Sequence, residues 1–188
     1  RNALVSNTTG AESVAVGIDA GNANTTGRIT AVGRHAVKNN TTATGTTGIG
    51  YRALRDNTTG ANNTALGGDA LLQNTTATEN TAIGFGAGYS NTTSSGVTYL
   101  GRMAGYSTTG QHNTFLGEAA GYYVTSGEKN TILGRYTGNQ SGLDFRTASN
   151  YIVLSDGDGV PRAGWWHTSG GNPHFNIQSD ISQWTVAA

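Results

Sequence analysis

One glycine recurs along the chain at intervals of 16 or 17 residues, and this spacing constrains the fold more than any other feature. The eight positions are Gly17, Gly33, Gly50, Gly67, Gly84, Gly101, Gly117 and Gly134. A period this short and steady is typical of a solenoid, in which each repeat forms one coil and stacks on its neighbours. The sequence therefore predicts a stack of eight coils, each about 17 residues long.

The two residues before each repeated glycine form two apolar columns. The position directly before it, which we name the aliphatic column, holds Val16, Val32, Ile49, Leu66, Ile83, Leu100, Leu116 and Leu133. The position before that is small at first and then larger: Ala15, Ala31, Gly48, Ala65, Ala82, Tyr99, Phe115 and Ile132. Because neighbouring side chains of a strand point to opposite faces, both faces of this strand are apolar.

A coil of this length has one narrow interior, and the column from Ala15 to Ile132, named here the lumen column, fits it. The aliphatic column then faces outward, where a continuous apolar stripe needs a partner. We therefore expect a homotrimer, in which two identical chains cover the column of the third around a shared axis. The alternative is a single-chain solenoid with a wider triangular cross-section that holds both columns.

The corners of the coil are marked by "NTTG" at residues 7–10, 24–27 and 57–60. Glycine supplies the positive φ that a tight corner needs, and asparagine bonds to nearby backbone. We predict two short strands and two corners per coil, with ladders of asparagine over asparagine and threonine over threonine. The predicted fold class is all-β, a parallel β-solenoid or β-roll. Residues just after the glycine, such as Arg34, Asp19 and Asp69, are expected in solvent.

Charge and cysteine content narrow the possible partners. The formal net charge is zero and only 12% of residues are charged, so we expect no nucleic-acid partner. No apolar run approaches the roughly 20 residues of a membrane helix, so no membrane insertion is expected. Cysteine is absent, which excludes disulfides, thiolate nucleophiles and cysteine zinc sites.

The chain begins at Arg1 rather than methionine, and we interpret it as a processed piece of something longer.

Composition changes after Gly138, which predicts a division into a repeat shaft, residues 1–138, and a separate small β element, residues 139–188, acting as connector or tip. All three tryptophans and both prolines lie in the second part. There "YIVLS" predicts a strand and the following "DGDG" a hairpin turn.

The strings "ESVAVGIDA" at residues 12–20, "NTALGGDA" at 63–70 and "NTAIGFGA" at 80–87 resemble the head repeat of trimeric autotransporter adhesins of the YadA type. That resemblance implies a left-handed parallel β-roll wound as a homotrimer. The extra "NTTG" corner makes the repeat more similar to the long repeats of phage tail fibres and other trimeric adhesive fibres. The stretch "NYIVLSDGDGVPR" at 150–162 is also similar to a tail-fibre segment that commonly precedes a self-cleaving chaperone domain. The resemblance covers roughly residues 7–162.

Acidic residues give no clear catalytic or metal site. Asp19 and Asp69 share a column, but three coils separate them by about 14 Å, and paired glycosidase carboxylates need roughly 5 to 9.5 Å. Asp156 and Asp158 are closer, but their "SDGDG" context favours a turn over catalysis or calcium binding. The four histidines show no metal-ligand spacing: His35, His112, His167 and His174. We therefore expect no catalytic residue, no metal and no cofactor.

Aromatic residues are the candidates for recognition. Trp165, Trp166 and His167 lie in the part that breaks the repeat, and tryptophan is favoured at binding surfaces. Tyr89, Tyr106 and Tyr122 fall in one column, which predicts either a strip for sugar rings or, preferably, a stacked structural ladder.

The function we expect is an adhesive or receptor-binding trimeric fibre, extracellular and most similar to a phage tail fibre, that binds a host cell-surface glycan or protein. One alternative is a bacterial surface adhesin, and another is a polysaccharide-cleaving tailspike enzyme. Threonine arrays also occur in ice-binding solenoids, but most threonines here are expected at corners, which argues against that function.

Overall fold

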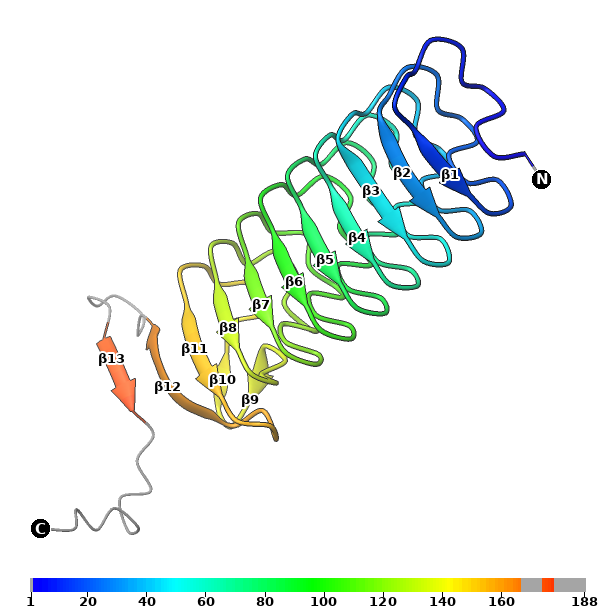
Figure 1. Ribbon diagram of the computed structural model, residues 1–188. Helices are drawn as coiled ribbons and strands as arrows, with labels where there is room; N and C mark the ends of the chain where they lie inside the picture. Colours follow the sequence, from blue (N-terminus) through cyan, green and yellow to red (C-terminus); the bar gives the residue numbers. More distant parts are fainter. Residues whose placement is uncertain (1, 167–173, 178–188) are drawn as a thin grey trace, which may run out of the picture.

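The computed structural model describes residues 2–166 and 174–177, and these form a rod of stacked β-coils with no helix among them (Figure 1). Each coil contributes one strand to a long parallel sheet along one side of the rod. The strands are β1 (Val14–Val16), β2 (Ile29–Val32), β3 (Thr46–Ile49), β4 (Thr64–Leu66), β5 (Thr81–Ile83), β6 (Thr98–Leu100), β7 (Thr114–Leu116) and β8 (Thr131–Leu133).

Equivalent positions of successive repeats pair with one another. In β4 and β5, for example, Ala65 lies opposite Ala82 and Leu66 opposite Ile83. This register confirms the eight predicted coils and the all-β parallel solenoid.

The expectation of two strands per coil was wrong, because the second side of each coil is a run of turns. Residues two and four places after the repeated glycine adopt left-handed backbone, as in Asp69 (φ 59°) and Leu71 (φ 48°). Two such residues in close succession interrupt an extended strand. Backbone bonds still join the coils on this side, as from Leu71 N to Ala87 O at 2.9 Å.

The two apolar columns separate to opposite faces of the sheet, as predicted. Every lumen-column residue from Ala31 to Ile132 is buried. The aliphatic column lies on the outer face, half-buried at Val32, Ile83 and Leu116 and exposed at the other five positions. In the single chain Val16 is 59%, Leu66 44% and Leu133 52% accessible. This separation excludes the alternative in which one wider chain holds both columns inside.

A second column on the outer face consists of the threonine that begins each strand from β4 to β8 and lies second in β2 and β3. Its members are Thr30, Thr47, Thr64, Thr81, Thr98, Thr114 and Thr131, all half-buried or exposed. The expectation that threonine serves mainly at corners was therefore incomplete. The outer face of the sheet carries alternating rows of threonine and aliphatic side chains.

Asparagine side chains form the predicted ladder inside one corner. The Nδ2 atoms of Asn40, Asn57 and Asn74 donate to the Oδ1 of the asparagine one coil earlier, at 2.8, 3.0 and 2.7 Å. Asn57 Nδ2 also donates to Gly60 O at 3.0 Å, which closes its own corner. Threonine hydroxyls behave differently, since Thr58 Oγ1 donates to the backbone oxygen of the next coil's threonine rather than to its side chain.

A ninth rung extends the sheet beyond the eight predicted coils. β11 (Ile152–Ser155) pairs in parallel with β8, placing Val153 opposite Ile132 and Leu154 opposite Leu133. Val153 is fully buried and Leu154 is 39% exposed, so both apolar columns continue. The sheet thus runs across the boundary predicted at residues 138 and 139, and that division stays a prediction.

The ninth coil is longer than the others because it carries an inserted hairpin of two short antiparallel strands, β9 (Asn139–Gln140) and β10 (Leu143–Asp144). Ser155 occupies the place of the repeated glycine, 21 residues after Gly134 (155 − 134). The sequence pattern missed this coil because both the spacing and the marker residue change together.

The predicted strand and turn at residues 151–159 are confirmed. After β11 the chain turns into β12 (Pro161–Trp166), which pairs antiparallel with β11 and with β13 (His174–Ile177). Asp156 Oδ1 accepts bonds from the backbone of Asp158 (3.0 Å) and Val160 (2.9 Å). Arg162 Nε donates to Asp156 Oδ2 at 2.7 Å, so both oxygens of this carboxylate are used to build the turn.

Replacing Tyr99 by phenylalanine is expected to leave stability unchanged or to raise it by about 1 kcal/mol. The Tyr99 ring stacks on Phe115 in the lumen at 5.3 Å, but its buried hydroxyl has no hydrogen-bond partner among the described residues. Burial in the lumen raises the pKa of Tyr99. Chemical denaturation measures the change. Tyr136→Phe is the matched control and should destabilise, because the Tyr136 hydroxyl donates to Leu143 O; a larger loss for Tyr99→Phe would contradict the assignment.

Stability is expected to fall as the pH rises from 10 to about 12. Burial raises the pKa of Tyr136 from 10.0 to about 12. The unfolded chain therefore loses this proton near pH 10, while the folded chain keeps it until about pH 12, so ionisation favours unfolding across that interval. Denaturation curves at pH 8, 10 and 12 measure the effect, and Tyr136→Phe should flatten the decline. An equal decline in that variant would show that Tyr136 does not cause it.

Candidate functional site

The two acids that share a column are each held by a basic neighbour. Asp19 lies 3.4 Å from His35 and 3.9 Å from Lys38, while Asp69 accepts two bonds of 2.8 Å from Arg52. Burial and the Lys38 charge lower the pKa of His35. Asp69 is only 7% exposed, so the expectation that positions after the glycine lie in solvent was wrong there, because Arg52 covers its carboxylate. Arg34 is exposed as predicted.

Neither a metal site nor a membrane-spanning helix occurs among the described residues. Within residues 2–165 no three His, Asp or Glu side chains are grouped as a metal site requires. The same part of the chain holds no helix long and apolar enough to cross a membrane.

Tyr89, Tyr106 and Tyr122 stack into a continuous ladder on the turn side of the rod. Ring centroids are 4.8 Å apart for Tyr89 and Tyr106 and 5.1 Å apart for Tyr106 and Tyr122, with planes within 15°. Burial raises the pKa of Tyr106. Both faces of the Tyr106 ring are therefore covered by tyrosine neighbours, which leaves mainly ring edges for a ligand. A receptor role for this column stays a prediction.

Trp165 lies on the same side of the sheet as the aliphatic column. It belongs to β12, stands opposite Ile152 of β11 in the antiparallel register, and is 43% exposed. Ile152 is 38% exposed on the outer face, so Trp165 extends the apolar surface beyond the shaft. The Trp166 side chain and His167, the other two predicted recognition residues, lie outside the described residues.

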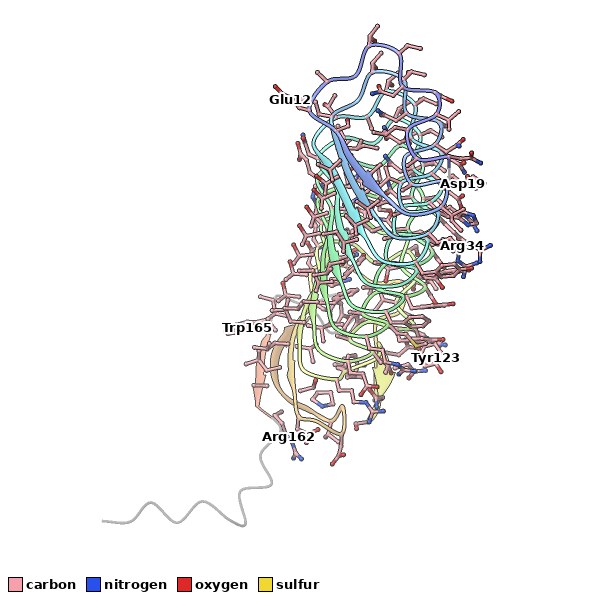
Figure 2. All side chains as sticks on the ribbon, turned by 45° about the vertical axis from the view of Figure 1, so that its right-hand side comes forward. Glu12, Asp19, Arg34, Tyr123, Arg162 and Trp165 are labelled. Carbon is pink, nitrogen blue, oxygen red and sulfur yellow. The ribbon has the colours of Figure 1, made fainter. Side chains whose placement is uncertain are left out.

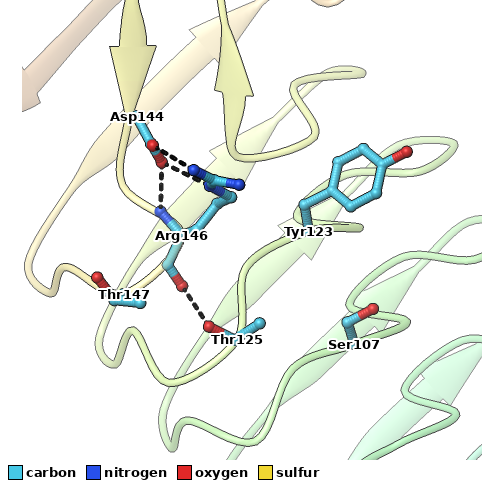
Figure 3. Close-up of a pocket in the computed structure, with 6 residues that line it drawn as sticks. All are labelled: Ser107, Tyr123, Thr125, Asp144, Arg146 and Thr147. Carbon is cyan, nitrogen blue, oxygen red and sulfur yellow. Dashed lines mark hydrogen bonds and ion pairs between the residues drawn. The ribbon is translucent and has the colours of Figure 1, made fainter.

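A shallow depression of about 400 Å³ lies where the inserted hairpin meets the shaft (Figure 3). Its lining residues are Ser107, Tyr123, Thr125, Asp144, Arg146 and Thr147. Tyr123 is 54% exposed, and its ring meets Tyr122 nearly at right angles (80°) with centroids 4.8 Å apart. The Tyr122 contact fixes an exposed aromatic ring beside a group of hydroxyl and charged side chains.

Asp144 and Arg146 form a bidentate ion pair in this depression. Arg146 donates to Asp144 through Nε at 3.0 Å, Nη2 at 2.8 Å and its backbone N at 3.1 Å. The guanidinium holds the pKa of Asp144 below its usual value, so both groups are charged at neutral pH. Thr125 Oγ1 donates to Arg146 O at 3.1 Å and ties the pair to the preceding coil.

Sequence reasoning missed this depression. Tyr123 lies one place after the predicted tyrosine column, and Asp144 and Arg146 lie in the insertion, where the period gives no position. The change in spacing after Gly134 was the only available sign that this part of the surface differs from the other coils.

These features define a parallel β-solenoid repeat protein with one apolar column inside and a second one exposed. The chain matches no protein-family model, and neither a curated protein nor a solved structure is significantly similar to it.

Proposed function

We propose that the chain is a segment of a homotrimeric, extracellular attachment fibre of the phage tail-fibre type, which binds a glycan or protein on a host cell surface. The observation that carries the proposal is the exposed aliphatic column. It runs without interruption along eight coils and continues into Leu154 of the ninth. Large continuous apolar patches are rare on monomers and mark surfaces that associate.

Three copies around one axis provide a cover for this column. Each chain presents the same narrow row of side chains along its whole length, and rotation about a parallel axis brings the three rows together at every coil. Ile152 and Trp165 on the same face would extend that interface past the shaft. The trimer would thus cover the exposed members of the aliphatic column in every coil.

A fibre that supports attachment needs stiffness and reach, and the coils supply both. Side-chain ladders and backbone bonds join each coil to the next, so the rod is held along its whole length. At about 4.8 Å per coil, the eight repeats extend roughly 38 Å. The ion pairs that engage Asp19 and Asp69 support attachment over polysaccharide cleavage, since neither acid is left free to act.

The proposal is tested by two measurements on the full chain. Light scattering should give three times the mass of the monomer, and the protein should bind bacterial cells from a panel of hosts. Trp165→Ala separates the two roles of that residue. Loss of cell binding at unchanged trimer mass would support recognition by Trp165, whereas loss of the trimer would place it in the interface. A monomeric chain that binds no cell would overturn the proposal.

A further inference from the structure

The inserted hairpin creates a polar surface that the repeat does not contain. Coils of 16 or 17 residues share one backbone path, whereas the ninth coil adds β9 and β10 and places Asp144 and Arg146 beside Tyr123 (Figure 3). Selective recognition needs a set of groups that occurs once per chain, because a repeated surface offers many equivalent sites. The depression is such a place in the described part of the shaft.

We propose that this depression binds a neutral saccharide through two adjacent hydroxyl groups. The inference rests on the proposed attachment function and assigns the recognition site to the junction of shaft and hairpin. Tyr123 supplies an apolar ring for one face of the sugar, and the Asp144–Arg146 pair supplies polar contacts for its hydroxyls.

The chemistry of the pair matches a vicinal diol. A carboxylate only accepts hydrogen bonds and a guanidinium only donates them, whereas each sugar hydroxyl does both. Arg146 has five N–H donors on its side chain, of which two point to Asp144 in the bonds described above, so others are available to a ligand. Both side chains are about half exposed, at 46% and 48%, which leaves them accessible from the depression.

The aromatic ring supplies the apolar part of the contact. Binding pockets for small molecules commonly combine an apolar or aromatic wall with a few fixed polar groups. Tyr123 contributes an amphipathic ring at low entropic cost, because Tyr122 already restricts its orientation. Hydroxyls of Ser107, Thr125 and Thr147 at the edge are suited to further contacts with a polyol.

A neutral ligand is favoured over an acidic one. The carboxylate of Asp144 neutralises Arg146 and would repel the carboxylate of a uronic or sialic acid. An acidic sugar could reach the N–H donors of Arg146 that Asp144 leaves unused, but only with its own carboxylate close to that of Asp144.

The position of the depression is compatible with the proposed trimer. Figure 2 shows Tyr123 on the side of the rod opposite the parallel sheet, whose outer face carries the aliphatic column. Three such sites would remain open when the columns pack together. A single shallow site binds weakly, and three on one rigid fibre raise the overall affinity by avidity.

The test uses the full chain on an array of neutral and acidic bacterial polysaccharides, with capsular and lipopolysaccharide O-chains in separate arms. Methyl glycosides of mannose, galactose and glucose, with methyl glucuronide as the acidic probe, are then titrated by NMR. Neutral glycans should bind, and Tyr123→Ala or Arg146→Gln should weaken binding about tenfold or more. Tyr123→Phe keeps the ring and should retain binding.

Matched controls are Phe85→Ala, which removes a ring that is 52% exposed elsewhere on the rod, and Arg102→Gln, which breaks an exposed pair with Glu118. Both should bind as the parent does. The inference is overturned if no neutral glycan binds, if only acidic glycans bind, or if Tyr123→Ala binds normally. If cell binding survives Tyr123→Ala, this site is refuted but the attachment function is not. If the chain is monomeric and still binds glycans, the homotrimeric fibre is refuted but the saccharide site is not.

Discussion

Leu66→Asp is expected to abolish the trimer. In the single chain Leu66 is 44% exposed in the middle of the aliphatic column, between Ile49 and Ile83 on the adjacent coils. In the proposed trimer the substitution would bring three carboxylates together in an apolar axis. Each buried charge without a partner costs several kcal/mol, so the three together exceed the stability of an ordinary assembly. Light scattering should report the monomer mass, and the melting temperature should fall steeply.

Tyr51→Asp is the matched control for this experiment. Tyr51 is 46% exposed, similar to Leu66, but it follows the repeated glycine and lies outside the aliphatic column. That variant should remain trimeric. If Leu66→Asp keeps the trimer mass and the melting temperature of the parent, the column is not buried and the trimer is refuted.

The sequence predicted the shaft because its pattern has one physical cause. In each coil one residue, such as Ala65, must fit the lumen. Its neighbour, such as Leu66, must then point outward, so the two columns follow from strand alternation alone. The second strand of each coil could not be predicted correctly. The strand is absent because residues such as Asp69 and Leu71 adopt left-handed backbone. Aspartate adopts this conformation fairly often but leucine rarely does, so the residue types do not reveal it.

The candidate site illustrates the opposite case. Tyr123, Asp144 and Arg146 come together only because an inserted hairpin folds back on the preceding coil. No period relates these residues, so their proximity depends on a tertiary arrangement. Trp165 shows a related limit, because its residue type suggested recognition, but only the sheet register shows that it lies opposite Ile152 on the outer face. Repetition makes the fold predictable from the sequence. Selectivity can arise where the repeat is interrupted, and the arrangement of side chains there is known only from the structure.

Gly84→Val is expected to destabilise the chain by roughly 3–5 kcal/mol, combining backbone strain with a steric clash. Gly84 has φ 133°, a conformation that residues with a Cβ rarely adopt. A Cβ added there would overlap with the carbonyl of Gly101, lying 2.6 Å from its carbon atom. The neighbour cannot move aside freely, because Gly101 has the same geometry against Gly117 and the contact repeats along the rod. Relief of the clash would therefore have to spread through the stack.

Two variants at positions that directly follow a repeated glycine, Phe85→Ala and Gly68→Ala, test whether the loss of stability is specific to the repeated glycines. Phe85→Ala should change stability by no more than about 0.5 kcal/mol, because the ring is 52% exposed. Gly68→Ala is the closer match, since a Cβ there would make ordinary contacts, with the Phe85 ring at 3.4 Å and Tyr51 O at 3.9 Å. Thermal denaturation should rank Gly84→Val far below both variants. If Phe85→Ala lowered the melting temperature more than Gly84→Val, the contact between successive glycines could not be the reason why every coil has glycine at this position.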